Sequence, residues 1–212
     1  MNEQLLEQLK QTYPDATCEL RYADEFQLLI AVILSAQCTD KRVNVVTERL
    51  FKAASTPQEI CDMELPVLEE YIRSCGLYKN KAANIKACCR DLVEKHNGQV
   101  PRTMDELTAL PGVGRKTANV MLSVAFGQPA IAVDTHVFRV SHRLGLSDGN
   151  TPDAVEKDLC AAFEPKDYRD VHFLIIKHGR DCCHARNPEC ENCSVNGLCA
   201  TYVTEQSRKS CL

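Results

Sequence analysis

The stretch Leu110-Pro111-Gly112-Val113-Gly114-Arg115-Lys116-Thr117-Ala118-Asn119 predicts two short helices joined by a tight turn. Thr103 and Glu106 have the spacing of a capping box, so a helix begins there, and the proline of the quoted stretch ends it. Gly112 and Gly114 let the backbone of the turn approach another surface closely. A second helix is expected to run from the turn to Gly127, because apolar residues recur there at helical spacing.

The start of this second helix is suited to binding a phosphate. Its first N–H groups lack partners within the helix, the helix dipole adds partial positive charge, and Arg115 and Lys116 are two cations. A connector between two core helices, with a solvated lysine, is the simpler interpretation of a GxG turn. The two-helix frame and the basic pair favour a helix-hairpin-helix that clamps a nucleic-acid backbone.

Charge is unevenly distributed along the chain. The 212 residues carry a net charge of −4, which argues against a protein that coats nucleic acid by bulk attraction. Residues 71–120, however, contain nine basic and four acidic residues, so this stretch carries +5 and the remainder −9. A local basic face on an acidic body fits a clamp with a defined footprint, although a run of solvated helix charges gives the same count.

The composition, with 44% hydrophobic residues, is that of a globular protein. No secretory leader is recognisable, and the longest apolar run, residues 28–34, is too short to cross a membrane. We therefore expect a cytoplasmic protein. No segment alternates as a strand would, and helix caps recur along the chain, so we predict an all-α fold of about ten helices.

Capping residues and glycines predict several helix boundaries. Thr56 opens a helix through a capping box, Thr151 opens another before a proline, and Asp24 is placed to cap the helix that follows it. Either Thr39 or Asp40 caps the helix that starts at residue 41, and Asp40 is the expected cap. Residues 81–96 are predicted to form a helix that stops at an Asn-Gly pair. Residues 167–178 are predicted to form another, which ends at Gly179.

Two loops carry residues whose purpose the helix pattern does not explain. The helix after Asp24 is apolar on all sides, which is typical of a buried helix, and it ends at a polar patch in which Gln37 has no capping role. Leu77 follows Gly76 in a second loop. It forms either the hydrophobic contact of a helix cap or an exposed wedge, of the kind that enters a gap in a base stack.

The C-terminal cysteines form a cluster with the spacing C-x6-C-x2-C-x5-C. Its members are Cys183, Cys190, Cys193 and Cys199. Four thiolates on such a loop make a closed site for either zinc or a [4Fe–4S] cluster. The single C-x2-C hook, with wide gaps on both sides, favours the larger iron–sulfur cluster. Cys182 competes for the place of first ligand, and Cys211 lies outside the pattern.

Together, the stretch at 110–119, the later Val133-Asp134-Thr135-His136 and the four cysteines resemble the endonuclease III family, iron–sulfur DNA glycosylases with AP-lyase activity. The resemblance extends from Ser35 to Cys199 and thus spans nearly the whole chain. The combination is much more specific than any single motif.

The resemblance implies a two-domain helix-hairpin-helix glycosylase fold with a C-terminal [4Fe–4S] loop. A six-helix barrel domain would comprise residues 18–127. Residues 1–17 and 128–212 would form the iron–sulfur domain, with a DNA-binding cleft between the two.

The resemblance also implies a role for each candidate site residue. Lys116 is the expected nucleophile and Asp134 the catalytic carboxylate, although Asp134 also precedes a helix and suits an N-cap. The residues expected to contact DNA are Gln37, Leu77, Gly112, Val113, Gly114 and Arg115. The expected ligands of the [4Fe–4S] cofactor are Cys183, Cys190, Cys193 and Cys199. Gln37 and Leu77 would fill the hole left by an extruded nucleotide.

The function implied is base-excision repair by a monomer that acts on double-stranded DNA with damaged pyrimidines or abasic sites. Lysine suits the lyase step, because a primary amine forms a Schiff base that acidifies the neighbouring C2′ proton. A free lysine is almost fully protonated at neutral pH, so a closed pocket must desolvate the amine.

Two other functions compete with this one. A monofunctional adenine or mismatch glycosylase shares the cluster and hairpin but uses activated water, and the presence of Lys116 argues against it. A non-catalytic DNA-binding or redox-sensing module would use Lys116 only as a phosphate contact.

Overall fold

The computed structural model describes residues 2–209, and within that range the secondary structure is entirely helical, without a strand. The all-α prediction is therefore confirmed. The chain divides into two compact units. We call Glu19–Gln128 the hairpin unit, and Met1–Cys18 together with Pro129–Leu212 the cysteine unit. Each unit is described by itself.

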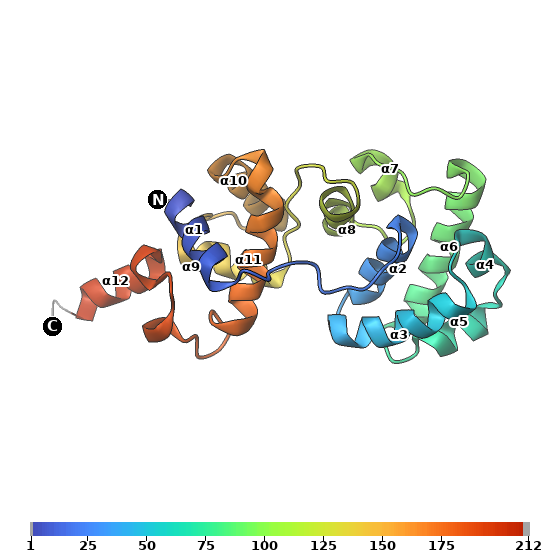
Figure 1. Ribbon diagram of the computed structural model, residues 1–212, viewed down its shortest axis with the longest axis horizontal. Coiled ribbons are helices and arrows are strands. Elements are labelled where there is room, and N and C mark those ends of the chain that lie inside the picture. The colour runs from blue at the N-terminus through green and yellow to red at the C-terminus, as the bar shows by residue number, and fades with distance from the viewer. Residues whose placement is uncertain (1, 210–212) are drawn as a thin grey trace. The chain divides into compact units, whose positions relative to one another are not determined.

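The hairpin unit is built around one apolar helix, α2 (Glu25–Ser35), whose residues from Leu28 to Leu34 are all at most 5% exposed. α2 packs against α3, α6, α8 and η1 (Figure 1). The other helices of this unit are α3 (Asp40–Ala53), α4 (Pro57–Asp62), α5 (Leu65–Ile72), α6 (Tyr78–His96), α7 (Met104–Ala109), α8 (Arg115–Val120) and the π-helical turn η1 (Met121–Ala125). A helix that is apolar on every side is stable only when its neighbours cover it, so α2 organises this unit.

The cysteine unit collects its core from both ends of the chain. Leu5, Leu6 and Leu9 of α1 (Asn2–Thr12) pack into the same apolar cluster as residues of α9, α10 and α11. The remaining elements are α9 (Thr135–Leu144), α10 (Pro152–Ala162), η2 (Pro165–Asp167), α11 (Tyr168–Asp181), η3 (Cys190–Asn192), η4 (Asn196–Leu198) and α12 (Ala200–Lys209). The N-terminal helix is thus part of this unit's core.

Most predicted helix starts are confirmed, and one is wrong. Asp24 caps α2 by accepting a hydrogen bond from the Gln27 N–H at 2.8 Å. Thr56 caps α4 in a complete capping box. The cap of α3 is Thr39, not Asp40, because the Thr39 hydroxyl accepts from the N–H of Arg42 and Asp40 is already helical.

Two other helix boundaries also differ from the prediction. α6 begins at Tyr78, three residues earlier than expected, directly after Leu77. α11 continues through Gly179 to Asp181. A Cβ added at Gly179 would lie 3.0 Å from the Val140 side chain of α9. Gly179 therefore allows two helices to pack closely and does not end its own helix.

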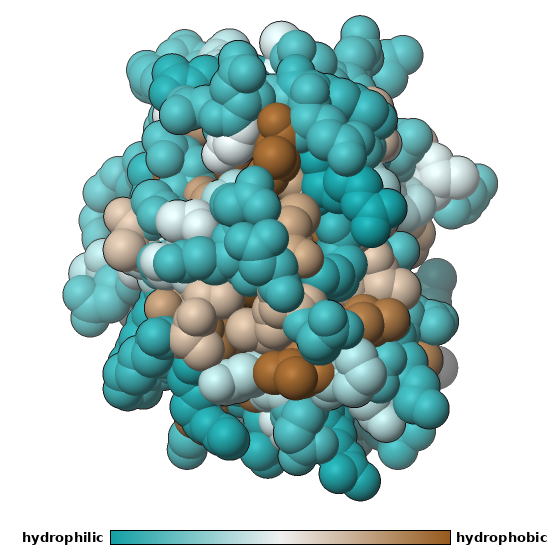
Figure 2. All heavy atoms as spheres, turned by 90° about the vertical axis from the view of Figure 1, so that its right-hand side faces the viewer, coloured by the Kyte–Doolittle hydropathy of each residue, from teal (hydrophilic) through white to brown (hydrophobic). Residues whose placement is uncertain are grey.

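The surface on the side of α4, α5 and α6 is mainly hydrophilic, and the hydrophobic side chains that reach it lie in small groups (Figure 2). Leu65 and Val67 of α5 are exposed apolar residues. Such scattered exposure is ordinary for a folded protein. No helix within residues 2–209 combines the length and the apolar character that crossing a membrane requires.

Candidate active site and metal centre

The glycine hairpin between α7 and α8 has two glycines with different functions. Gly112 has φ +80°, and a Cβ there would lie 2.9 Å from Cβ of Asn84 on α6, so only glycine fits. Gly114 has φ −93°, and a Cβ there would meet no atom within 4 Å among the described residues. The first glycine is required by the fold, whereas the second leaves open space in front of the turn.

The residues around the hairpin divide between core and surface. Val113 is 5% exposed and anchors the turn. Arg115 and Lys116 occupy the first turn of α8, where both are exposed. Gly114 is the N-cap and has no side chain to accept from the first N–H groups of the helix. The start of α8 therefore has no side-chain cap on its first N–H groups, and an exposed lysine lies beside them.

Gln37 and Leu77 are brought together within the hairpin unit. A Cβ added at Gly76, next to Leu77, would lie 3.4 Å from the backbone oxygen of Gln37. Both residues have left-handed backbones, with φ +54° and φ +57°. Neither is a glycine or an asparagine, so each conformation costs about 1–3 kcal/mol, and strain of this kind concentrates at functional sites.

The exposure of Leu77 argues against one of the two interpretations of its loop. Its side chain is 61% exposed, which is not the packing of a hydrophobic cap contact. The exposed wedge is the interpretation that fits this exposure. Gln37 is also exposed, directly after the C-cap residue of α2.

Two lysines of the basic stretch donate to backbone carbonyl groups, and neither is fully exposed. Lys81 is 5% exposed, and its Nζ donates to the backbone oxygens of Leu34 and Ala36 at 2.8 and 2.6 Å. Nζ of Lys86 donates to three backbone oxygens at the end of α4. The positive count of residues 71–120 therefore overstates the basic face, and nothing in the sequence pattern distinguishes these two lysines from the exposed ones.

Asp134 is the N-cap of α9 in the cysteine unit. Its Oδ1 accepts hydrogen bonds from the backbone N–H groups of His136 and Val137, both at 2.8 Å. Its Oδ2 lies 3.4 Å from Nδ1 of His136. The N-cap interpretation is confirmed. The two hydrogen bonds of the cap fix the orientation of this carboxylate.

The four cysteines of the C-terminal pattern line one cavity of about 290 Å³. None of the cysteines within residues 2–209 forms a disulfide, and Cys211 lies outside the described residues. Burial raises the pKa of Cys190 and of Cys199, and the thiols of Cys183 and Cys193 act in the same direction. Such a gathering of thiols is stabilised when a metal removes their protons, because thiolates are the ligands.

Two arginines of α9 hold the first part of the cysteine loop. Nη2 of Arg139 donates to the backbone oxygen of Cys183 at 3.0 Å. Nη1 of Arg143 donates to the oxygen of His184 at 2.6 Å and lies 3.4 Å from the Cys183 sulfur. The Cys199 thiol donates to the Arg143 oxygen at 3.1 Å. The cysteine spacing gave no sign of either arginine.

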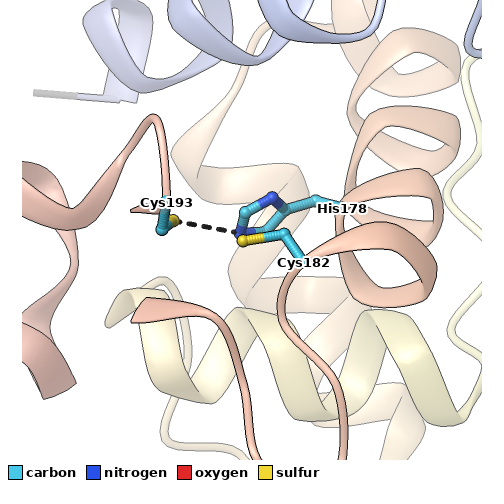
Figure 3. A group of neighbouring side chains, drawn as sticks. All are labelled: His178, Cys182 and Cys193. Atoms are coloured by element: carbon cyan, nitrogen blue, oxygen red, sulfur yellow. Dashed lines mark hydrogen bonds between the residues drawn. The ribbon is translucent and has the colours of Figure 1, made fainter. Parts of the chain in front are cut away.

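Cys182 lines the same cavity but has a different set of neighbours. It lies with His178 and Cys193, and the ligand atoms of these three are within 4.8 Å of one another (Figure 3). Burial, and then the Cys193 thiol, raise the pKa of Cys182 to about 12. Burial lowers the pKa of His178 to about 4, so the imidazole is neutral at neutral pH. Sequence spacing did not identify His178 as a neighbour of the site.

The fold and the site together define a class of protein. Residues 30–165 match the HhH-GPD superfamily of base excision DNA repair proteins. Residues 183–199 match the iron–sulfur binding domain of endonuclease III. The second match begins at Cys183 and ends at Cys199, and both of these residues line the cavity.

The similarity to individual proteins is more specific. The chain is 51% identical to endonuclease III of Haemophilus influenzae, over 92% of this chain and 93% of that protein. It is 45% identical to endonuclease III of Escherichia coli strain K12, with the same coverage. A solved trapped covalent intermediate of an endonuclease III with DNA superposes with a TM-score of 0.91, at 48% identity, over 97% of this chain and 99% of that one.

The chain belongs to the endonuclease III family. Its function is base-excision DNA repair, and it is a DNA glycosylase and AP lyase. The cofactor of this family is a [4Fe–4S] cluster, which decides against zinc. The residues present fit that cofactor, because four thiols share one cavity and an arginine N–H points at one of the sulfurs.

Proposed function

We propose that this chain excises oxidised or saturated pyrimidines from double-stranded DNA and then cuts the strand by β-elimination through Lys116. The observation that carries the proposal is the position of Lys116, exposed in the first turn of the helix behind the glycine hairpin. The trapped covalent complex of the 48% identical relative supports a nucleophilic side chain in this family.

In the proposed reaction, the neutral amine of Lys116 attacks C1′ of the damaged nucleotide. The bond between C1′ and the base breaks, the base leaves with the electron pair and takes up a proton, and the opened sugar forms a Schiff base with the lysine. Loss of a C2′ proton then expels the 3′ phosphate. Because a free lysine is almost fully protonated, we propose that the closed complex with DNA desolvates this amine.

Asp134 is the proposed catalytic carboxylate. A negative charge stabilises the positive charge that develops on the sugar as the base leaves, as carboxylates do in glycoside hydrolysis. It can also accept the proton that the attacking amine loses. The two N–H groups that bind Oδ1 hold the carboxylate in one orientation, which favours both roles.

The other candidate residues are proposed to bind DNA. Gly112, Val113, Gly114 and Arg115 would bind the phosphate backbone through the hairpin. Gln37 and Leu77 would occupy the space left by the extruded nucleotide and offset part of the few kcal/mol that extrusion costs. The closeness of Gly76, next to Leu77, to the Gln37 backbone oxygen and the exposure of both side chains support a shared role.

Cys183, Cys190, Cys193 and Cys199 are the proposed ligands of the [4Fe–4S] cluster. All four line the cavity, and Nη1 of Arg143 lies 3.4 Å from the Cys183 sulfur, where it can donate to a thiolate. The cluster, when bound, gives the loop after α11 a fixed shape. We further propose that the chain acts as a monomer in the cytoplasm, on the DNA of the nucleoid.

Borohydride reduction tests the nucleophile, since it converts a Schiff base into a stable amine. We expect the wild type to form a covalent complex with duplex DNA that contains an oxidised pyrimidine. Lys116→Ala is expected to form none. Lys95→Ala, which removes one exposed cation of α6 in the same unit, is the control and should trap like the wild type. Undiminished trapping by Lys116→Ala would refute the assignment.

A further inference from the structure

Lys81 is a buried lysine that lies beside the two loops of Gln37 and Leu77. Its side chain is 5% exposed, and its Nζ donates to the carbonyl oxygens of Leu34 and Ala36 at 2.8 and 2.6 Å. These carbonyls belong to the last turn of α2, where backbone oxygens lack helical partners and the helix dipole is negative. The amine is therefore well satisfied in this place, which explains why a lysine is tolerated in the core.

Lys81 connects the two loops through its side chain and its place in α6. Its Nζ binds the carbonyl of Ala36, which immediately precedes Gln37. Leu77 lies one helical turn before Lys81, and its carbonyl accepts the Lys81 backbone N–H at 3.0 Å, a helical bond that does not depend on the side chain. Gln37 and Leu77 both have left-handed backbones. Strained conformations of this kind persist only where the surroundings hold them.

We propose that Lys81 is a positioning residue that fixes Gln37 and Leu77 in the arrangement that fills the hole in the duplex. This inference rests on the proposed function of Gln37 and Leu77. Lys81 itself does not touch the reacting atoms. Loss of its amine frees the Ala36 carbonyl, releases the turn that carries Gln37, and separates it from Leu77.

Lys86 provides a matched control on the same helix. Its Nζ donates to the backbone oxygens of Ile60, Cys61 and Met63, at 3.2, 2.6 and 2.6 Å. Lys86 thus donates to the carbonyl oxygens at the end of α4, as Lys81 donates to those at the end of α2. Its carbonyl partners belong to neither loop, so its loss reports only the structural cost of removing such a lysine.

The test compares Lys81→Met with Lys86→Met on two substrates. The first is duplex DNA with an oxidised pyrimidine, in which extrusion leaves a hole. The second is single-stranded DNA with an abasic site, in which no paired base and no stacked hole exist. We expect Lys81→Met to lose about tenfold to a hundredfold in kcat/KM on the duplex and to stay within about twofold on the single strand. Lys86→Met should keep the wild-type ratio of the two activities.

An equal loss on both substrates for Lys81→Met, or the same substrate ratio in both variants, would overturn the inference, because either result is what a purely structural lysine gives. If Lys81→Met does not fold, Lys81→Arg keeps the charge while changing its shape, and the same loss of duplex preference is expected. Gln37→Ala and Leu77→Ala test the underlying roles separately. If they lose duplex preference and the Lys81 variants do not, only the inference fails.

A second observation, in the cysteine unit, carries an independent inference about His178. This residue is 1% exposed, and its two ring nitrogens have different partners. Nδ1 lies 3.0 Å from the Tyr13 hydroxyl of the segment after α1, and Nε2 lies 3.7 Å from the Cys193 sulfur (Figure 3). A cysteine that ligates iron is a thiolate and can only accept, so Nε2 must carry the proton. Nδ1 is then the acceptor, and the Tyr13 hydroxyl must donate to it.

We infer that His178, oriented by Tyr13, donates a hydrogen bond to the Cys193 ligand and raises the reduction potential of the bound cluster. A hydrogen bond to a ligand sulfur favours the more negative, reduced form. The Tyr13 ring packs edge-on against the imidazole, with ring centroids 5.8 Å apart. Tyr13 is thus a positioning residue, and its hydroxyl decides which nitrogen donates.

Voltammetry of the purified holoenzyme tests this inference. We expect His178→Phe to lower the potential and Tyr13→Phe to lower it by less, with unchanged iron content in the second variant. Tyr168→Phe is the control, because its hydroxyl donates to the Cys160 oxygen at 2.7 Å, outside the cavity. If His178→Phe loses the cluster, the potential of Tyr13→Phe alone tests the inference. A wild-type potential in Tyr13→Phe would contradict the inference.

Discussion

The hairpin unit and the cysteine unit assemble their functional groups differently. In the hairpin unit, the glycines and cations of the proposed phosphate site follow one another in a single stretch, from the turn after α7 into the first turn of α8. In the cysteine unit, the cavity takes its sulfurs from the C-terminal loop, its arginine from α9 and its imidazole from α11. The tyrosine that bonds to that imidazole comes from the other end of the chain.

This difference determines what each unit depends on. A contiguous motif keeps its shape through backbone geometry, so the positive φ of Gly112 and the burial of Val113 maintain the hairpin. A site assembled from distant segments depends on long-range contacts and, when loaded, on the cluster itself. Substitution of a cysteine ligand should therefore destabilise a larger part of its unit than substitution of a hairpin residue does.

The largest effect is expected for loss of a cysteine ligand. Cys199→Ser removes one of the four thiols of the cavity, so the holoprotein should lose its iron and its visible absorption, and the cysteine unit should unfold at lower temperature. Cys182→Ser is the matched control, since this thiol is additional to the four. Iron analysis and thermal unfolding measure both, and equal iron loss in the two variants would make Cys182 a ligand.

The two glycines of the hairpin should separate folding from DNA binding. Gly112→Ala meets Asn84 and adopts a left-handed backbone, so we expect it to lose about 1–3 kcal/mol of unfolding free energy. Gly114→Ala has space for its Cβ and an ordinary φ, so it should unfold like the wild type but bind duplex DNA more weakly. Urea unfolding and fluorescence anisotropy measure the two quantities. Wild-type affinity in Gly114→Ala would argue against close approach of a phosphate.

Asp134 should show two separable contributions. Asp134→Ala removes the cap of α9 and is expected to cost about 1 kcal/mol of unfolding free energy. Asp134→Asn keeps an acceptor for the two N–H groups and should be nearly as stable as the wild type. Both variants are expected to lose about a hundredfold or more in kcat with little change in KM. A wild-type kcat in Asp134→Asn would contradict the catalytic role and leave helix capping as the only function of Asp134.

The smallest effect is expected at a purely local cap in the hairpin unit. Backbone and hydroxyl donors of Ser55 and Thr56 hold the pKa of Glu59 below its usual value of 4.5. The carboxylate therefore adds stability above that pH, and this contribution disappears as the pH falls through the lower, folded-state pKa. At neutral pH, Glu59→Gln should unfold at a slightly lower urea concentration than the wild type. In acid, the two proteins should unfold at the same urea concentration. A constant difference across that range would contradict the assignment.

Local signals in the sequence predicted much of the fold. Capping by Asp24, Thr56 and Thr151 depends on residues within one turn of each other, and the structure has all three caps. The expected cap Asp40 is wrong because Thr39 and Asp40 are neighbours with similar capping ability, which only the backbone conformation can rank. The pattern also predicts a helix end at Gly179, whereas this glycine allows close packing against α9, which is a tertiary property.

The candidate site was predictable where its residues are close in sequence. The hairpin and the cysteine spacing are such patterns. Lys81, however, has the same local context as an exposed lysine, and only the end of α2 makes it a buried one. The pairing of Tyr13 with His178 joins residues at opposite ends of the chain, so no spacing could indicate it.

One amine, that of Lys116, is proposed to attack the sugar. Peptide mapping by mass spectrometry of the borohydride-trapped complex with DNA tests this directly. We expect the reduced sugar adduct on the peptide that contains Lys116, and on that residue. An adduct on another lysine, such as Lys79 beside the Leu77 loop, or on the N-terminal amine would contradict it.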